Sequence, residues 1–168
     1  MAKSKIGVKL DFTGLLEDIQ RAGGNASAAA KQAAEECAKV YEAELRAECN
    51  ADGIPASITN EIRQEVTVES GGNVYAVKVG WEKGEYDPKN PSAAYKAIFL
   101  NYGTPKGERT VQEQKRVHHE LGGRWVTLRK NRGKLVARGF IGRAQKNADK
   151  KVKKVQKETL ARILKGLK

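Results

Sequence analysis

The chain has 168 residues, of which 39% are apolar, and a formal net charge of +12. This length and apolar content suit a single domain with a two-layer core. No run approaches the roughly 18 apolar residues that a membrane span needs, and the first residues lack the apolar segment of a signal peptide. We therefore expect a protein that is made and kept in a cytoplasm, with no membrane partner.

The charge is divided unequally along the chain. Residues 1–104 hold 12 Lys and Arg against 15 Asp and Glu, a net of −3, whereas residues 105–168 hold 20 against 5, a net of +15. Such an asymmetry favours a polyanion or an acidic protein surface near the basic half. Solvated lysines on an amphipathic helix are the alternative explanation.

The first half of the chain begins with a strand pattern and continues with helical patterns. Apolar residues alternate over residues 6–12, which predicts a half-buried strand. Thr13 can cap a short helix over residues 14–22, and Asn25 offers a second N-cap. From there to about Cys49, small and apolar residues recur every three or four positions, which predicts a long helix with a face that another element can approach closely.

Both cysteines fall on this predicted helix. Cys37 and Cys49 are twelve residues apart, so an α-helix places them about 18 Å apart along its axis. A disulfide needs much closer Cα atoms. We expect two reduced, half-buried thiols.

Next come a predicted hairpin and a further apolar run. Residues 61–70 and 73–81 flank Gly71–Gly72, and the second arm places every other apolar residue on one face. After a polar loop, the run Ala97–Leu100 resumes the core. We interpret this run as a core strand that ends at Tyr102, Gly103 and Thr104.

Residues 105–136 form a connection longer than the roughly 12 to 15 residues that are usual between elements. We predict an extended basic hairpin arm, with strands near 124–130 and 134–140 on either side of a turn at 131–133, preceded by one or two helical turns. From Phe140 onward the apolar residues return with helical spacing, and this predicts a C-terminal helix. Most of its lysines fall opposite the apolar arc, among them Lys146, Lys150, Lys153, Lys154 and Lys157.

The order of elements predicts a single α+β domain over residues 1–168. In it a small antiparallel sheet is packed by a long N-terminal helix and a C-terminal helix, and the extended basic hairpin arm protrudes at residues 105–136.

The sequence offers little that predicts catalysis. The adjacent His118 and His119, followed by Glu120, point in different directions on a helix or strand, so they do not form the i, i+4 pair of a zinc protease. The glycine pairs lack the spacing of phosphate-binding loops, and no nucleophile has a neighbouring base. We expect no enzyme, no metal and no cofactor.

The predicted arm is rich in basic residues that can lie along phosphates without reading sequence. These candidates for contact with DNA or with a partner are Arg124, Arg129, Lys130, Arg132, Lys134 and Arg138. A solvated arm whose Trp125 and Leu128 pack on a neighbouring subunit is the alternative.

Two short motifs suggest a relationship. The first is Tyr102-Gly103-Thr104, and the second runs from Ala137 to Ala144 and includes Phe140. With these motifs and its order of elements, the chain resembles the tail-component or head–tail joining proteins of long-tailed bacteriophages, which are also called neck or tail-completion proteins. Where that family usually has a proline before the phenylalanine, this chain has Gly139.

The resemblance implies a non-enzymatic ring subunit at the junction between head and tail. The implied partners are further copies of the same chain, with a hexamer as one candidate ring, neighbouring neck and tail-tube proteins, and packaged DNA through non-specific contacts. The implied location is the virion, after assembly in the host cytoplasm. A cytoplasmic protein that binds nucleic acid without sequence preference is the alternative function.

Overall fold

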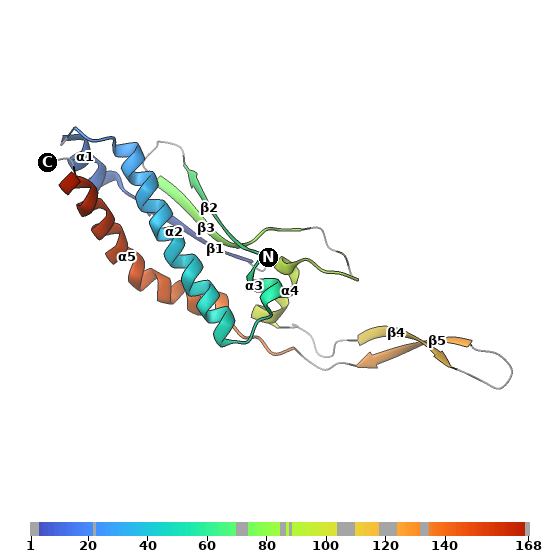
Figure 1. Ribbon diagram of the computed structural model, residues 1–168. Helices are drawn as coiled ribbons and strands as arrows, with labels where there is room; N and C mark the ends of the chain where they lie inside the picture. The colour runs from blue at the N-terminus through green and yellow to red at the C-terminus, as the bar shows by residue number, and fades with distance from the viewer. Residues whose placement is uncertain are drawn as a thin grey trace.

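A computed structural model describes residues 4–21, 23–69, 74–84, 87, 89–103, 110–117, 124–131 and 135–166. For residues 13–16, 110–117 and 124–131 it describes the backbone alone. The elements in chain order (Figure 1) are β1 (Lys5–Asp11), α1 (Thr13–Arg21), α2 (Ala26–Ala51), α3 (Ala56–Thr59), β2 (Ile62–Val68), β3 (Val74–Trp81), α4 (Ala93–Tyr102), β4 (Thr110–Val117), β5 (Arg124–Asn131) and α5 (Phe140–Gly166).

The main sheet has the strand order β1-β3-β2, and both neighbours of β3 run antiparallel to it. The register pairs Ile6 with Val79 and Ile62 with Trp81, so alternate residues of each strand point to the same face. That face is buried, whereas the opposite face carries charged side chains such as Glu65, which lies 3.9 Å from the ammonium groups of both Lys5 and Lys78. The period-two prediction for β1 and the hairpin prediction for β2 and β3 are both confirmed.

Helix α2 covers the buried face of the sheet. Asn25 caps its N-terminus, since its side-chain oxygen accepts a hydrogen bond of 3.1 Å from the amide of Ala28. The buried residues are mostly small, which lets both the sheet and α5 approach the helix backbone closely: Ala26, Ala29, Ala30, Ala33, Ala34, Cys37, Ala38, Tyr41, Leu45 and Cys49.

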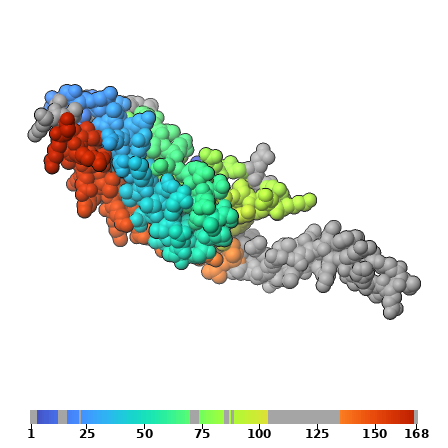
Figure 2. Space-filling model, viewed as in Figure 1, coloured from blue at the N-terminus to red at the C-terminus, as the bar shows by residue number. Residues whose placement is uncertain are grey.

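Helix α5 lies side by side with α2 and runs in the opposite direction (Figures 1 and 2). Polar contacts tie the two helices along their length. The Tyr41 hydroxyl donates to Asp149 at 2.6 Å, and Lys151 lies 2.6 Å from Glu44. The predicted α+β architecture, a small antiparallel sheet packed by a long N-terminal and a C-terminal helix, is confirmed.

Both cysteines are free and fully buried on α2, rather than half-buried as the sequence suggested. Burial disfavours the charged thiolate, so it raises the pKa of Cys37 to about 11 and that of Cys49 to about 12. Both groups are therefore poor nucleophiles.

The interpretation of residues 97–102 as a strand is wrong. They belong to α4, which begins at Ala93 and ends at Tyr102. Ala94 and Ala97 are buried, and Ala97 faces the core one turn before Asn101. A short apolar run fits a strand and a buried helix equally well, and here the alanines and the helical spacing decide for the helix.

A second sheet has two strands, β4 and β5, which pair antiparallel with Thr110 opposite Asn131 and Val117 opposite Arg124. The predicted pairing of residues 124–130 with residues 134–140 is therefore wrong, as is the helical expectation for residues 110–117. Residues 110–117 include the β-branched Thr110, Val111 and Val117, and β-branched residues favour a strand. The basic arm itself stays a prediction, because the side chains of both strands lie outside the described residues.

Candidate functional site

The two motifs meet in space. The amide of Arg138 donates to the carbonyl of Leu100 at 3.2 Å, and the amide of Gly139 donates to the carbonyl of Asn101 at 3.0 Å. These bonds join the end of α4 to the segment that leads into α5. We call this contact, formed by residues 99–103 and 135–144, the motif junction.

Gly103 ends α4 at the motif junction. Its φ of +71° lies in the region that favours glycine, and its amide donates to the carbonyl of Phe99 at 2.8 Å. A Cβ atom added here would lie 2.5 Å from the carbonyl oxygen of Leu135 and 2.8 Å from the amide nitrogen of Ala137. The close approach of the two segments therefore requires glycine.

Asn101 is a central residue of the junction that sequence reasoning did not single out. It is 4% exposed, and its side-chain oxygen accepts a hydrogen bond of 2.9 Å from the amide of Ile141. This bond satisfies a free amide in the first turn of α5. The sequence held one indication of this role: Asn101 carries an amide side chain at the end of an apolar run. A buried amide side chain needs a hydrogen-bond partner.

Two arginines attach the junction to the end of α2. Arg143 lies 2.7 Å from Glu48 and 2.8 Å from Asp52, and the hydrogen bonds to these carboxylates, that to Glu48 first, raise its pKa. The guanidinium of Arg138 donates to the backbone carbonyl of Asp52. Cations are favoured at this position, because the C-terminus of a helix carries partial negative charge.

The motif residues Phe140 and Ala144 are fully buried. Phe140 meets Trp81 edge to face with ring centroids 6.1 Å apart, and the Trp81 indole N–H donates to the carbonyl of Ile58 at 2.6 Å. Phe140 therefore anchors the start of α5 to the sheet, and Ala144 lies in the core one turn later.

Large apolar side chains remain exposed beside the junction. Phe99 and Tyr102 are 42% and 48% exposed, and they share one face of α4 because they are three residues apart. Val136, in the segment that passes Gly103, is 73% exposed. We call these three residues the junction patch.

The predicted basic arm residues are only partly placed. The backbone of Arg124, Arg129 and Lys130 belongs to β5, and their side chains lie outside the described residues. Arg132, Lys134 and Thr104 also lie outside the described residues, as do His118, His119 and Glu120. The structure describes Arg138, whose guanidinium donates a hydrogen bond to the backbone carbonyl of Asp52 at the end of α2.

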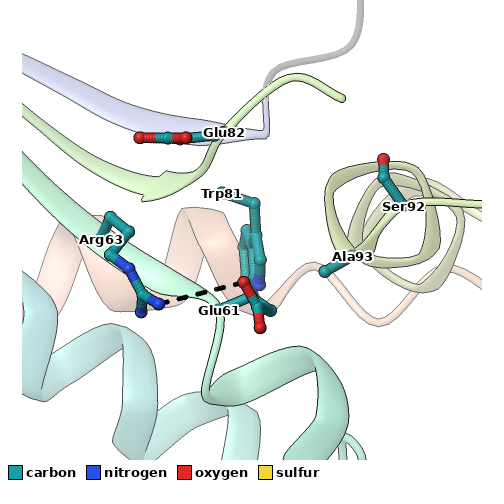
Figure 3. Close-up of a pocket in the computed structure, with 6 residues that line it drawn as sticks. All are labelled: Glu61, Arg63, Trp81, Glu82, Ser92 and Ala93. Atoms are coloured by element: carbon teal, nitrogen blue, oxygen red, sulfur yellow. Dashed lines mark ion pairs between the residues drawn. The ribbon is translucent and has the colours of Figure 1, made fainter. Parts of the chain in front are cut away.

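A pocket of about 270 Å³ opens near the start of α4 (Figure 3), and its lining residues are Glu61, Arg63, Trp81, Glu82, Ser92 and Ala93. Glu61 and Arg63, which are two residues apart on the same segment, form an ion pair of 4.0 Å. Its charged groups are of both signs, and these six residues supply no nucleophile with an adjacent base. The pocket therefore offers no arrangement suited to acyl or phosphoryl transfer.

Within the described ranges, no group of three His, Cys, Asp or Glu side chains is arranged to hold a metal ion. Among the same residues, no helix combines the length and the apolar character needed to cross a lipid bilayer.

Comparison with known proteins identifies the family. Residues 14–103 match the family described as "Bacteriophage HK97-gp10, putative tail-component". The chain belongs to this family of phage tail components. The match ends at Gly103, within the motif junction, and the basic half of the chain lies beyond it. No curated protein and no solved structure matches the chain.

Membership confirms the resemblance to phage tail and head–tail proteins and indicates a structural component of the virion that contacts other virion proteins. The alternative, a cytoplasmic protein that binds nucleic acid, gains no support from the family.

Proposed function

We propose that this chain is a non-enzymatic ring subunit that completes the tail or joins head to tail. The ring consists of copies of this chain, with a hexamer as one candidate, and it sits between neck and tail-tube proteins after assembly in the host cytoplasm. Packaged DNA passes through it and meets basic residues of the arm without sequence preference.

The junction patch is the observation that carries this proposal. Three large apolar side chains are exposed within one small region, beside a backbone contact that needs a glycine and a buried asparagine. Exposed apolar side chains that lie together mark surfaces for protein contact. The motif junction holds Gly103 and Leu135 close together, so the chain between them begins and ends beside the patch.

Ring formation is the arrangement that uses these features together. In a ring each subunit offers one surface to the next and receives a different one, so a segment that leaves the body beside an apolar patch can reach the neighbour. We also propose that residues 105–136 form an arm of this single domain, as the sequence predicts, because an arm at this position would extend toward the neighbouring subunit.

The test is complementation of a phage that lacks this gene. The variant carrying Phe99→Ser, Tyr102→Ser and Val136→Ser should yield filled heads and separate tails in negative-stain micrographs. Val68→Ser is the matched control, because Val68 is 56% exposed on β2, away from the patch, and should leave joining intact. Normal virions from the triple variant would contradict the assignment of the patch, whereas labelled protein found away from the head–tail junction and tail would contradict the proposed function.

A further inference from the structure

The outward face of α5 carries a row of lysines. Lys146, Lys150, Lys153 and Lys157 are all exposed. At about 100° per residue they fall within an arc of roughly 60°, and at 1.5 Å per residue the row is about 16 Å long. We call these four residues the lysine row.

The charge of the lysine row is not neutralised within the described part of the protein. None of its four ammonium groups has an ion-pair partner among the described residues. Asp149, the one acidic residue between Arg143 and Lys157, accepts a hydrogen bond from the Tyr41 hydroxyl on α2. By contrast, the lysines just beside the row are paired: Lys151 with Glu44, and Lys154 with Glu158.

We propose that the lysine row is a binding surface for duplex DNA that acts through phosphate contacts and without sequence preference. Duplex DNA carries about one negative charge per 1.7 Å with both strands counted, so a length of duplex of about 16 Å carries on the order of ten phosphates, more than the four lysines of the row. Packing fixes the position of the lysine row on the surface. Ala144, Ala148 and Val152 are buried on the opposite side of the same helix and hold it against the rest of the protein.

A second copy of this chain is a poorer fit as the partner. A protein partner would have to present a matching row of free carboxylates, and most described carboxylates are already engaged by a cation of their own chain. These engaged residues are Glu17, Glu36, Glu42, Glu44, Glu48, Asp52, Glu61, Glu65, Glu69 and Glu158. DNA needs no such matching surface.

This inference depends on the proposed function in one respect only: the proposed function supplies the place, inside the ring, where the protein would encounter DNA. The binding itself is a property of the full chain in solution, so it can fail while tail completion stands, and the reverse is also possible.

The experiment measures binding of the full chain to a fluorescent 24-base-pair duplex by anisotropy between 0.05 and 0.2 M salt. The row variant is K146Q/K150Q/K153Q/K157Q. The matched control, K5Q/K9Q/K39Q/K78Q, loses the same charge from lysines that are paired on the sheet and on α2. A third variant, R129Q/K130Q/R132Q, removes charge from the predicted arm.

We expect the row variant to lose about tenfold or more in affinity at 0.15 M salt. Its salt dependence should flatten by up to about 0.9 in slope for each phosphate that the variant no longer neutralises. The control should lose less than about threefold, which reflects net charge alone. Two duplexes of different sequence should bind the wild-type protein equally.

Equal losses in the row variant and the control would overturn the proposal. So would absence of binding by the wild-type chain at 0.15 M salt, or a loss confined to the arm variant. A change in sedimentation of the row variant without a change in DNA binding would also overturn it and would identify a second copy as the partner.

Discussion

The two long helices of this protein have nearly the same length but differ in how many of their sides are packed against other elements. Helix α2 has 26 residues and is packed on two sides, by the sheet and by α5, so its buried positions are mostly alanine. Helix α5 has 27 residues and is packed on one side only, so its other side is free to carry lysine. The difference shows that burial sets the side-chain size on α2, whereas α5 is constrained on its inner face alone.

The substitution with the largest expected effect on stability tests how the buried face of α5 is packed. Phe140→Ala removes a fully buried ring that packs on Trp81, and it should lower the free energy of unfolding by about 3 to 5 kcal/mol. Chemical denaturation measures this. Phe99→Ala is the same substitution at a 42% exposed position and should cost less than about 1 kcal/mol. Equal costs would show that α5 is not anchored through Phe140.

The substitution with the next largest expected effect on stability tests the motif junction, where the segment before α5 contacts the end of α4. Gly103→Ala must hold alanine at a φ of +71° and displace the backbone at Leu135 and Ala137, so a loss of about 1 to 3 kcal/mol is expected. Gly142→Ala is the matched control. Its Cβ meets open space within α5, and it should raise stability by about 0.4 to 1 kcal/mol. A neutral Gly103→Ala would mean that the two segments do not approach as closely as the structure shows.

A third substitution tests the two-sided packing of α2. Ala34→Leu overpacks a position that is 0% exposed and should cost about 1 to 3 kcal/mol. Ala43→Leu places the same side chain on an exposed position of the same helix, where the change should stay within about 0.5 kcal/mol. An unchanged denaturation midpoint for Ala34→Leu would show that α2 is open on that side.

The sequence predicted the elements whose pattern is long or regular. The alternation in β1, the Asn25 cap and the small-residue spacing of α2 each specify an element through local physics. The run before Gly103 was misassigned, because ten residues of mixed apolar and small character do not distinguish a strand from a buried helix. The sequence partner of β5 was also misassigned, because strand pairing is not a local property.

The candidate site was only half visible from the sequence. Both motifs were recognised, but their contact depends on backbone bonds between residues nearly 40 positions apart, such as that from Arg138 to Leu100. Asn101 was overlooked because its importance arises only when burial leaves the amide of Ile141 as its partner. Residues of this kind are identified by the packing around them rather than by their own type.

The smallest expected effect compares two adjacent lysines of α5. Lys151 lies 2.6 Å from Glu44 of α2, whose side chain is 16% exposed, so Lys151→Gln should cost about 0.2 to 1 kcal/mol. Lys150→Gln changes the lysine row, which contacts no described carboxylate, and should leave the midpoint of denaturation unchanged. In the DNA assay the order should reverse, because only Lys150 faces the proposed phosphates. If Lys150→Gln proved the more destabilising of the two and left DNA binding intact, the outer face of α5 would be structural and its contrast with α2 would disappear.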